Sequence, residues 1–423
     1  MAKITHIWAR EILDSRSTPT IEAALSIDTN HVTLSSVPSG ASIGSHEALE
    51  LRDNDLERFK GKGVLRAVAT INQVIAPALI GMDPTNQLEI DNRLIEIDGT
   101  ENKSSLGANS ILAVSEVVAK AGAIASGTSL YKYINLLSTK IGLQTKIQMP
   151  IPIFNMIEGG KHGAVNLDFQ EFFVIPVRSK TYSDGLRMAS EIYMTLGENL
   201  TRRGAIHSVG IEGGYAPNLF TNADALEIIV DSIKQTEYNL GTDLVLGLDV
   251  AANTIFKNGS YQIRDKSSPM DETSFIEYFK NLNETYHLAI LEDPLQEDAW
   301  AGWVHLTEAL KDQTIVVGDD LLVTNPKRIA KAIAEKAGSA AIIKPNQIGT
   351  VTETLKVIKL AKDAQWKIVV SHRGGETNDW FIADFAVGVG ADYVKFGAPA
   401  RGERLAKYNR LLAVEAELSS STK

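Results

Sequence analysis

From about residue 149 onward, short apolar runs that end in a polar or charged residue recur along the sequence, with helical patterns between them. From the third run onward the repeat is roughly 25 residues, the length of one strand–helix unit. Strands that are apolar along their length are typical of parallel sheets buried on both faces. The pattern favours an α/β fold with an eight-stranded (β/α)₈ barrel over an open sheet, although counting alone does not separate the two. The runs cover residues 244–249, 289–293, 315–320, 340–344, 367–372 and 393–395.

The front third of the sequence has a different pattern. Residues 4–12, 20–27 and 31–37 mix β-branched and apolar residues and predict an antiparallel meander. Apolar residues at helical spacing follow at 64–80 and 109–125, so this part predicts an α+β domain. A chain of 423 residues is long enough for two domains. We predict an N-terminal domain of residues 1–140 and a barrel domain of residues 141–423.

Composition narrows the function classes. The net charge is −10, with 52 acidic and 42 basic residues, which disfavours a general nucleic-acid binder. No apolar run of about 18 residues is apparent, so we expect no membrane span. The first 14 residues contain charges and no apolar signal core, which predicts no secretion signal. The lack of cysteine excludes disulfides and fits a reducing compartment, so we expect a cytoplasmic protein.

The residues at the end of each apolar run are candidate active-site residues, because barrel active sites lie at the carboxyl ends of the strands. Asp249, Glu292 and Asp319 close three successive runs. Three carboxylates in register form the oxygen-rich environment that Mg²⁺ prefers. A single Asp at such a position is as readily a helix N-cap. Three acids in register, followed by basic residues in register, favour a metal site.

Basic residues close the later runs. Lys344 follows Asp319 by one strand–helix unit. Beside a metal-bound carboxylate, burial and neighbouring cations would lower its pKa and make it a base for a carbon acid. His372, Arg373 and Lys395 follow, and the two cations suit a phosphate group. For Arg373 and Lys395, the alternative is an internal ion pair to Asp319, Asp320 or Glu292.

Two glycine-rich stretches add candidate acid–base groups. Residues 157–163 contain His162 and are followed by Gln170 and Glu171, and residues 209–215 contain Glu212. Glycine lets the backbone approach a ligand closely. Taken alone, each stretch is better interpreted as an ordinary loop.

Many short motifs together resemble the enolase family, from about residue 7 to the last helix. The most specific are Asp-Ser-Arg at 14–16, Ser-Gly-Ala-Ser at 39–42, Glu-Ala-Leu-Glu-Leu-Arg-Asp at 47–53, Gln-Glu-Phe at 170–172, Glu-Gly-Gly at 212–214, Gly-Asp-Asp-Leu at 318–321 and Lys-Pro-Asn-Gln-Ile-Gly at 344–349. The resemblance implies an N-terminal α+β capping domain and a modified (β/α)₈ barrel. It also implies a lyase that reversibly dehydrates 2-phosphoglycerate to phosphoenolpyruvate with two Mg²⁺ ions per active site.

The resemblance assigns expected roles to single residues. Asp249, Glu292 and Asp319 match ligands of the first Mg²⁺, and Ser42 matches a contact to the second and to substrate. Lys344 matches the base at C2 and Glu212 the acid at the C3 hydroxyl. The remaining matches are substrate and supporting positions: His162, Gln170, Glu171, His372, Arg373 and Lys395. An enzyme that uses a Lys base with Mg²⁺ in this way is a known pattern of the superfamily. The family also implies a homodimer or a higher homo-oligomer.

Six positions depart from the family pattern, and most lie beside the predicted site: Ser17, Thr18, Ile43, Ile211, Gly374 and Phe396. Gly374 stands where a serine hydroxyl usually helps to hold the phosphate, and Phe396 would reshape the same end of the site. Ile211 would reduce the hydration of the neighbouring Glu212 carboxyl group and so raise the pKa of Glu212. Two alternatives therefore stay open. One is a related enzyme acting on a phosphonate or similar analogue, as relatives that form carboxyphosphonoenolpyruvate do. The other is a non-catalytic paralogue with a binding role.

Overall fold

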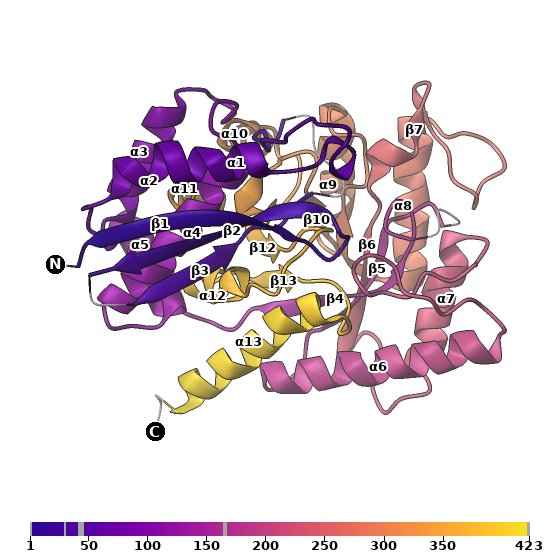
Figure 1. Ribbon diagram of the computed structural model, residues 1–423. Coiled ribbons are helices and arrows are strands. Elements are labelled where there is room, and N and C mark those ends of the chain that lie inside the picture. Colours follow the sequence, from indigo (N-terminus) through magenta and orange to yellow (C-terminus); the bar gives the residue numbers. More distant parts are fainter. Residues whose placement is uncertain (1, 29–30, 41–45, 164–166, 421–423) are drawn as a thin grey trace.

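The computed structural model describes residues 2–28, 31–40, 46–163 and 167–420. Within them the chain forms a three-stranded sheet with its helices and a closed eight-stranded barrel (Figure 1). Ser42 and Ile43, which the sequence analysis singled out, lie outside the described residues.

The N-terminal sheet has the three antiparallel strands that the sequence predicted. They are β1 (Ile4–Leu13), β2 (Pro19–Ile27) and β3 (Val32–Ser36), in the order β1-β2-β3. The helices beside them are α1 (Leu65–Thr70), α2 (Ala76–Leu79), α3 (Gln87–Asp98) and α4 (Ala108–Ala125). Residues 71–75, between α1 and α2, form a π-helical turn just before Pro77. Because proline has no backbone N–H, it cannot continue the regular hydrogen-bond ladder.

Helix α4 is the core helix of this domain. Among the described helices it is the one long and apolar enough to cross a membrane, but 83% of it is buried inside the protein. It packs on β2 and β3, and its apolar residues join those of the sheet in one hydrophobic core. Its apolar character is therefore explained by packing within this domain.

The barrel closes in the order β10-β11-β12-β13-β4-β5-β6-β9. All six predicted runs form barrel strands. Two further strands, β4 and β5, were not among the predicted runs, and they lie before and after the glycine-rich stretch that was interpreted as a loop. The bounds are β4 (Ile151–Glu158), β5 (Glu171–Pro176), β6 (Leu244–Asp249), β9 (Leu288–Glu292), β10 (Ile315–Gly318), β11 (Ala340–Ile343), β12 (Lys367–Ser371) and β13 (Tyr393–Lys395).

Strand β5 runs antiparallel to both of its neighbours, β4 and β6, whereas the other barrel pairs are parallel. The fold is therefore a modified (β/α)₈ barrel. Inward-facing apolar side chains such as Ile153, Phe173 and Ile342 fill its interior.

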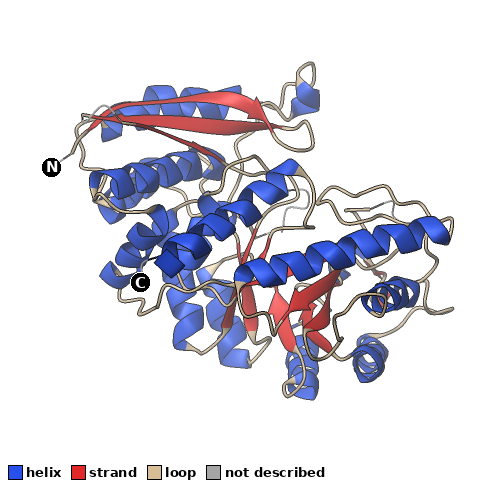
Figure 2. Ribbon diagram, turned by 90° about the horizontal axis from the view of Figure 1, so that it is seen from below, coloured by secondary structure: helices blue, strands red, loops and turns tan. Residues whose placement is uncertain are grey.

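Helices surround the barrel strands, and the sheet forms a separate layer (Figure 2). These helices are α6 (Tyr182–Arg202), α7 (Asn222–Ile233), α8 (Glu272–Tyr286), α9 (Trp300–Leu310), α10 (Pro326–Glu335), α11 (Val351–Asp363), α12 (Phe381–Gly388) and α13 (Gly402–Ser420). A short hairpin, β7 (Phe256–Lys257) and β8 (Ser260–Tyr261), follows β6.

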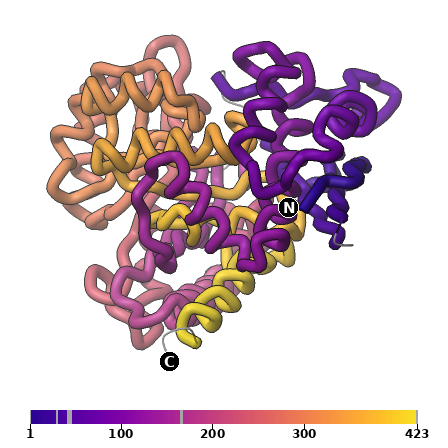
Figure 3. Tube along the Cα trace, turned by 90° about the vertical axis from the view of Figure 1, so that its left-hand side faces the viewer, coloured from indigo at the N-terminus to yellow at the C-terminus, as the bar shows by residue number. Residues whose placement is uncertain are grey.

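The indigo N-terminal strands lie on one side of the molecule and the pink-to-orange barrel units on the other (Figures 1 and 3). Helix α5 (Leu130–Lys140) ends at the predicted domain boundary of 140/141, and it packs on α12 of the barrel. Its side chains Tyr131, Ile134 and Leu137 belong to the barrel's hydrophobic core. The boundary itself stays a prediction.

A buried polar cluster joins the two parts. Glu116 of α4 is 4% exposed and accepts a hydrogen bond of 2.9 Å from the Ser35 hydroxyl. Asp379, which precedes α12, pairs with Lys120 of α4 at 2.7 Å and accepts the backbone N–H of Ser36. Burial, followed by repulsion from Asp379, raises the pKa of Glu116 to about 8. This carboxyl group is therefore protonated in the folded protein at pH values where the unfolded chain would ionise it.

The raised pKa predicts a pH-dependent effect of Glu116→Gln. Between about pH 4.5 and 8 the folded state binds more protons at this site than the unfolded state, so the free energy of unfolding falls as the pH rises. The neutral amide removes that dependence. We expect the variant to match the native chain near pH 5 and to be about 1–3 kcal/mol more stable at pH 8.5.

Urea unfolding at a series of pH values measures this difference. The control is Glu284→Gln, an exposed position on α8. If Glu116→Gln gives the same small offset at every pH, then Glu116 does not titrate with a raised pKa.

Candidate active site

Three predicted carboxylates meet at one edge of the barrel. Asp249 ends β6, Glu292 ends β9, and Asp319 directly follows β10. These strands are neighbours in the order β6-β9-β10, and Asp249 and Glu292 are direct register partners. Asp249 and Glu292 are 2% and 1% exposed. The parallel strands thus bring together side chains that are 70 positions apart in sequence.

The reversed strand β5 adds a fourth carboxylate to the same edge. Because β5 runs antiparallel, its first residue, Glu171, lies beside the last residues of its neighbours and pairs in register with Asp249 and Glu158. The preceding residue, Gln170, donates a hydrogen bond of 3.1 Å from Nε2 to Oδ2 of Asp249. The sequence pointed to Gln170 and Glu171 but gave no sign of the strand reversal that places them.

Lys395, the last residue of β13, neutralises part of this charge. Its Nζ lies 2.7 Å from Glu292, 3.1 Å from Glu171 and 3.4 Å from Asp249. The lysine is 3% exposed. The internal ion pair to Glu292, which was the alternative interpretation of Lys395, is therefore confirmed.

The cluster fits a divalent cation. Burial is the main cause that raises the pKa of Asp249 to about 6, although Lys395 opposes it. The same causes hold the pKa of Glu292 well above its usual range. Anionic oxygens crowded in this way gain from added positive charge, and Mg²⁺ takes oxygen ligands of this kind. The donor set of Asp249, Glu292 and Asp319 is chemically suited to that ion.

Asp293 is a buried acid that has a different role. Its two carboxylate oxygens accept the backbone N–H groups of Asp319 (2.9 Å) and Asp320 (2.8 Å). Possible ligand atoms of these three acids all lie within 4.8 Å of one another. Asp293 thereby fixes the loop that carries Asp319, a support that the sequence did not indicate.

Lys344 follows β11 and forms an ion pair with Asp319. The lowered pKa that the sequence predicted applies to a lysine beside a metal-bound carboxylate, and it stays a prediction. Burial is the largest single cause and opposes the charge, but nearby carboxylates, Asp319 first and Glu292 after it, together outweigh burial and raise the pKa of Lys344 above its usual value. Lys344 is therefore an ammonium group while it is paired with Asp319.

His162, Glu171 and Glu212 form a second buried group, with possible ligand atoms within 4.8 Å of one another. Nδ1 of His162 lies 3.0 Å from Glu171 and 3.7 Å from Glu212. Burial opposes a charge on the ring, but Glu212 and Glu171 outweigh it and raise the pKa of His162 to about 9. His162 thus carries a proton between two carboxylates.

The pKa of Glu212 is shifted in the direction opposite to the one predicted from Ile211. Burial favours the neutral acid, but the His372 and His162 rings outweigh it and hold the pKa of Glu212 well below its usual range. The prediction of a raised value was wrong because it considered the apolar neighbour alone. The two histidines come from distant parts of the sequence.

Arg404 of α13 fixes the tautomer of His372. Its guanidinium group lies 2.8 Å from Nδ1 of His372, and arginine can only donate. Nδ1 must then accept, so Nε2–H donates to Glu212 across 3.1 Å. Burial, with help from Arg404, lowers the pKa of His372. His372 is therefore a neutral donor, and Glu212 is its ionised acceptor.

Arg373 is held by an acid that the sequence analysis did not connect with it. Its guanidinium group pairs with Glu47 at 3.0 Å and donates to the Asn346 side chain at 3.0 Å. Gln347 also donates to Glu47, at 3.3 Å, and to Asp319 at 3.3 Å. In the sequence, the only indication that Glu47 belongs to the site was its place in the family-like motif of residues 47–53.

A small cavity of about 30 Å³ collects the predicted residues. Most predicted catalytic and substrate positions line it, and so does Gly374. Phe396 does not line it: its side chain is fully buried against Tyr408 in the core, so it does not shape the phosphate end directly. The lining residues are His162, Gln170, Glu171, Glu212, Asp249, Asp319, Lys344, Ser371, His372, Arg373, Gly374 and Lys395.

The carboxylate cluster predicts a metal-dependent effect of Lys395→Met. Without the ammonium group, Glu171, Asp249 and Glu292 lose their shared counter-charge. We expect the free energy of unfolding in EDTA to fall by about 3–5 kcal/mol. Saturating Mg²⁺ should recover part of the loss, since ligand binding stabilises the folded state.

Urea unfolding with EDTA or with Mg²⁺ tests this effect, and Lys356→Met, at an exposed position of α11, is the control. If the loss is identical with and without Mg²⁺, these carboxylates are not the ligands.

Comparison with protein-family models agrees with this geometry. Residues 4–134 match the enolase N-terminal domain, and residues 146–423 match the enolase C-terminal TIM barrel domain. The two matches cover nearly the whole chain and coincide with the sheet domain and the barrel. The chain therefore belongs to the enolase family.

Proposed function

We propose that this protein is a Mg²⁺-dependent lyase that reversibly dehydrates 2-phospho-D-glycerate to phosphoenolpyruvate. One observation carries the proposal: Lys344 and the group of His162, Glu171 and Glu212 line the same buried cavity. Loss of water from adjacent carbons needs a base at one carbon and a proton donor at the other. The lack of cysteine also supports a reducing compartment such as the cytoplasm.

Lys344 is the proposed base that removes the proton at C2. It needs a neutral amine for this, and the Asp319 carboxylate opposes that state. The amine becomes available when the charge of Asp319 is engaged by another partner. Asp249, Glu292 and Asp319 would hold one Mg²⁺ and Ser42 would contact a second, and the ions would supply positive charge beside the substrate carboxylate.

The second group supplies the proposed acid at C3. His162 holds a proton between Glu171 and Glu212. We propose that Glu212 delivers this proton to the departing hydroxyl and that Glu171 keeps the His162 ring in place. His372 donates to Glu212 from the other side and orients its carboxylate.

The remaining cavity residues are the proposed substrate contacts. Gln170, His372, Arg373 and Lys395 line the cavity, and Arg373 offers a planar fork for phosphate. Glu47 now pairs with that fork. A dianionic phosphate would compete with Glu47 for Arg373, so substrate entry requires Glu47 to move or to share the guanidinium group.

Lys344→Ala tests the proposal. We measure the ultraviolet absorbance of the enol product from 2-phosphoglycerate, with and without Mg²⁺. The native chain should give a metal-dependent rise, and the variant should lose about 10²–10⁴-fold in kcat. Isothermal titration should show that Mg²⁺ still binds, because Lys344 is not a ligand, and Lys356→Ala is the matched control.

Undiminished turnover by Lys344→Ala would exclude Lys344 as the base. A flat trace from the native chain, with Mg²⁺ bound, would instead reject 2-phosphoglycerate as the substrate. The same assay would then be repeated with phosphonate analogues, which Gly374 would accommodate without the usual serine hydroxyl.

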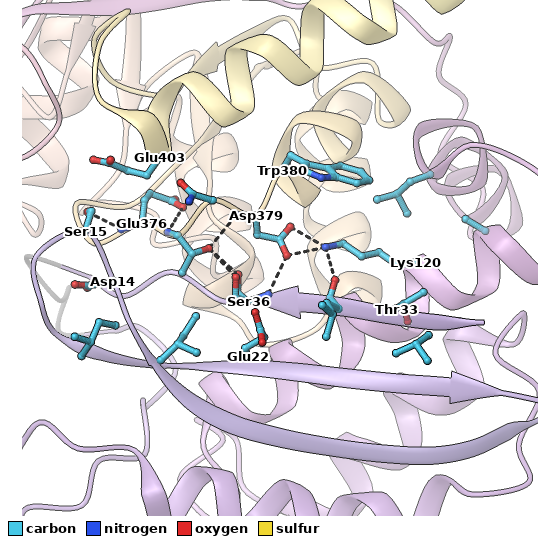
Figure 4. Close-up of a pocket in the computed structure, with 18 of the residues that line it drawn as sticks. Asp14, Ser15, Glu22, Thr33, Ser36, Lys120, Glu376, Asp379, Trp380 and Glu403 are labelled. Carbon is cyan, nitrogen blue, oxygen red and sulfur yellow. Dashed lines mark hydrogen bonds and ion pairs between the residues drawn. The ribbon is translucent and has the colours of Figure 1, made fainter. Parts of the chain in front are cut away.

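We also propose that the protein forms a homodimer through a groove between the N-terminal sheet and residues 376–380, which precede α12 (Figure 4). The groove has a volume of about 780 Å³. Leu13, Val32, Leu34 and Trp380 in its lining are 54%, 56%, 52% and 38% exposed, which is unusual for large apolar side chains grouped together. A symmetric dimer would cover this face in both copies at once.

Leu34→Asp should weaken that dimer, because it puts a charge into the apolar face of β3. Sedimentation equilibrium should show mainly monomer for the variant at concentrations where the native chain is dimeric. Met194→Asp is the control, since Met194 is 59% exposed on α6 and does not line the groove. A native chain that is monomeric, or a variant that stays dimeric, contradicts this interface.

A further inference from the structure

Glu158 is a fully buried carboxyl group that has no role in the mechanism above, and burial, followed by repulsion from Glu212, raises its pKa to about 8. It is the last residue of β4 and is 0% exposed. Its side chain points to the loop of residues 209–215, which carries Glu212. Oε1 and Oε2 accept the backbone N–H of Glu212 at 3.2 and 3.1 Å, and Oε1 accepts the N–H of Gly214 at 2.5 Å.

The backbone of β4 holds the same loop at its far end. The N–H of Glu158 donates to the carbonyl of Tyr215 at 2.8 Å, and the N–H of Tyr215 donates to Met156 at 2.9 Å. Tyr215 therefore extends the β4 edge as an isolated bridge. For the amides of Glu212 and Gly214, the Glu158 carboxyl group is the acceptor within the described residues.

The glycines of the loop fit around this carboxyl group. A side chain at Gly210 would clash with Oε2 of Glu158, and a Cβ at Gly214 would lie 3.0 Å from its Cγ. Gly213 has φ +94°, a conformation that other residues rarely adopt. The glycines therefore allow the loop to pack closely around Glu158, so that the backbone N–H groups of Glu212 and Gly214 both reach its buried carboxyl group.

The loop has a second anchor, but that anchor acts on other atoms. Arg404 donates to the carbonyl of Ile211 at 3.0 Å, and the N–H of Ala398 donates to the carbonyl of Glu212 at 3.0 Å. These contacts hold carbonyl groups of the loop, and the N–H of Ile211 donates to the carbonyl of His162 at 3.1 Å, whereas Glu158 holds the N–H groups of Glu212 and Gly214. Both the carbonyl and the N–H groups must be held if the Glu212 carboxylate is to stay between His162 and His372.

We propose that Glu158 is a positioning residue for Glu212. Its carboxyl group fixes the backbone of residues 212–214 and so sets the distance from the Glu212 side chain to His162 and His372. Glu158 does not line the cavity and would not touch substrate. The catalytic consequence rests on the function proposed above, but the structural consequence does not.

Two substitutions separate geometry from charge. Glu158→Gln keeps an oxygen that can accept both N–H groups, and Glu158→Met removes both acceptors at a similar length. We expect kcat with 2-phosphoglycerate to fall about 10-fold in the first and about 100-fold in the second. KM should change less than 3-fold, because substrate contacts are kept.

Exchange of the C2 hydrogen with solvent deuterium gives a finer readout. Lys344, on the other side of the site, performs that step in the proposed mechanism, so exchange should persist in both variants while dehydration falls. The matched control is Asp91→Asn. Asp91 is also fully buried and also accepts a backbone N–H, from Thr352 at 2.9 Å, but it lies on α3.

Amide hydrogen exchange of a peptide spanning residues 211–215 tests the positioning itself, without any turnover. In Glu158→Met the amides of Glu212 and Gly214 should exchange at least 10-fold faster than in the native chain. Glu158→Gln should be intermediate, and Asp91→Asn should leave this peptide unchanged. Unchanged protection in Glu158→Met overturns the proposal, as does a KM that rises as much as kcat falls. If the native chain does not act on 2-phosphoglycerate, the proposed function fails while the amide result still decides the role of Glu158.

Discussion

The balance of buried charge at the carboxyl edge of the barrel is the constraint on which the site depends. Four carboxylates, from β5, β6, β9 and the end of β10, are packed where little water reaches them. Isolated ions in such surroundings are costly, so each must have a partner. Lys395 supplies charge to three of the acids and Lys344 to the fourth. A ligand that enters the site must replace any of these ion pairs that it breaks, so that no buried charge is left without a partner.

The reversed strand β5 makes that concentration of charge possible. In an all-parallel barrel, the residue that begins a strand lies at the opposite end from the active site. Reversal brings Gln170 and Glu171 to the edge that Asp249 and Glu292 occupy. It also places Glu158, the last residue of β4, directly opposite Glu171. The connection between β4 and β5 therefore ends with Glu171 in the cavity lining and begins after Glu158, which lies behind that lining.

The sequence predicted the elements that have a periodic signal and missed those that depend on contacts. The runs ending at Asp249, Glu292 and Lys395 could be recognised because apolar strands closed by a polar residue recur along the chain. Strands β4 and β5 were missed because the glycines beside them resemble ordinary loops. Glu47 and Glu158 could not be assigned, since their partners, Arg373 and the Glu212 backbone, are far away in sequence.

The pKa direction predicted for Glu212 failed for a related reason, and Lys344 without a bound metal shows the same balance. Burial and apolar neighbours can be estimated from local sequence, and for Lys344 and Glu212 they act in the directions that were predicted. Burial is the largest single cause for both groups, but charged and polar groups on other strands and loops together outweigh it, led by Asp319 for Lys344 and by the two histidines for Glu212. The direction of each pKa shift therefore depends on distances between charged groups in the fold, and the sequence does not contain those distances.

The tautomer of His372 limits which group near Glu212 can hold a proton. Arg404 forces Nδ1 to accept, so Nε2–H points at Glu212 and favours its ionised form. Glu171 is likewise engaged with the Lys395 ammonium group. His162, lying between the two carboxylates, is then the group that holds the proton. Glu212 would pass that proton on without having to store it, so its low pKa is compatible with a role as donor, provided that the loop keeps it beside His162.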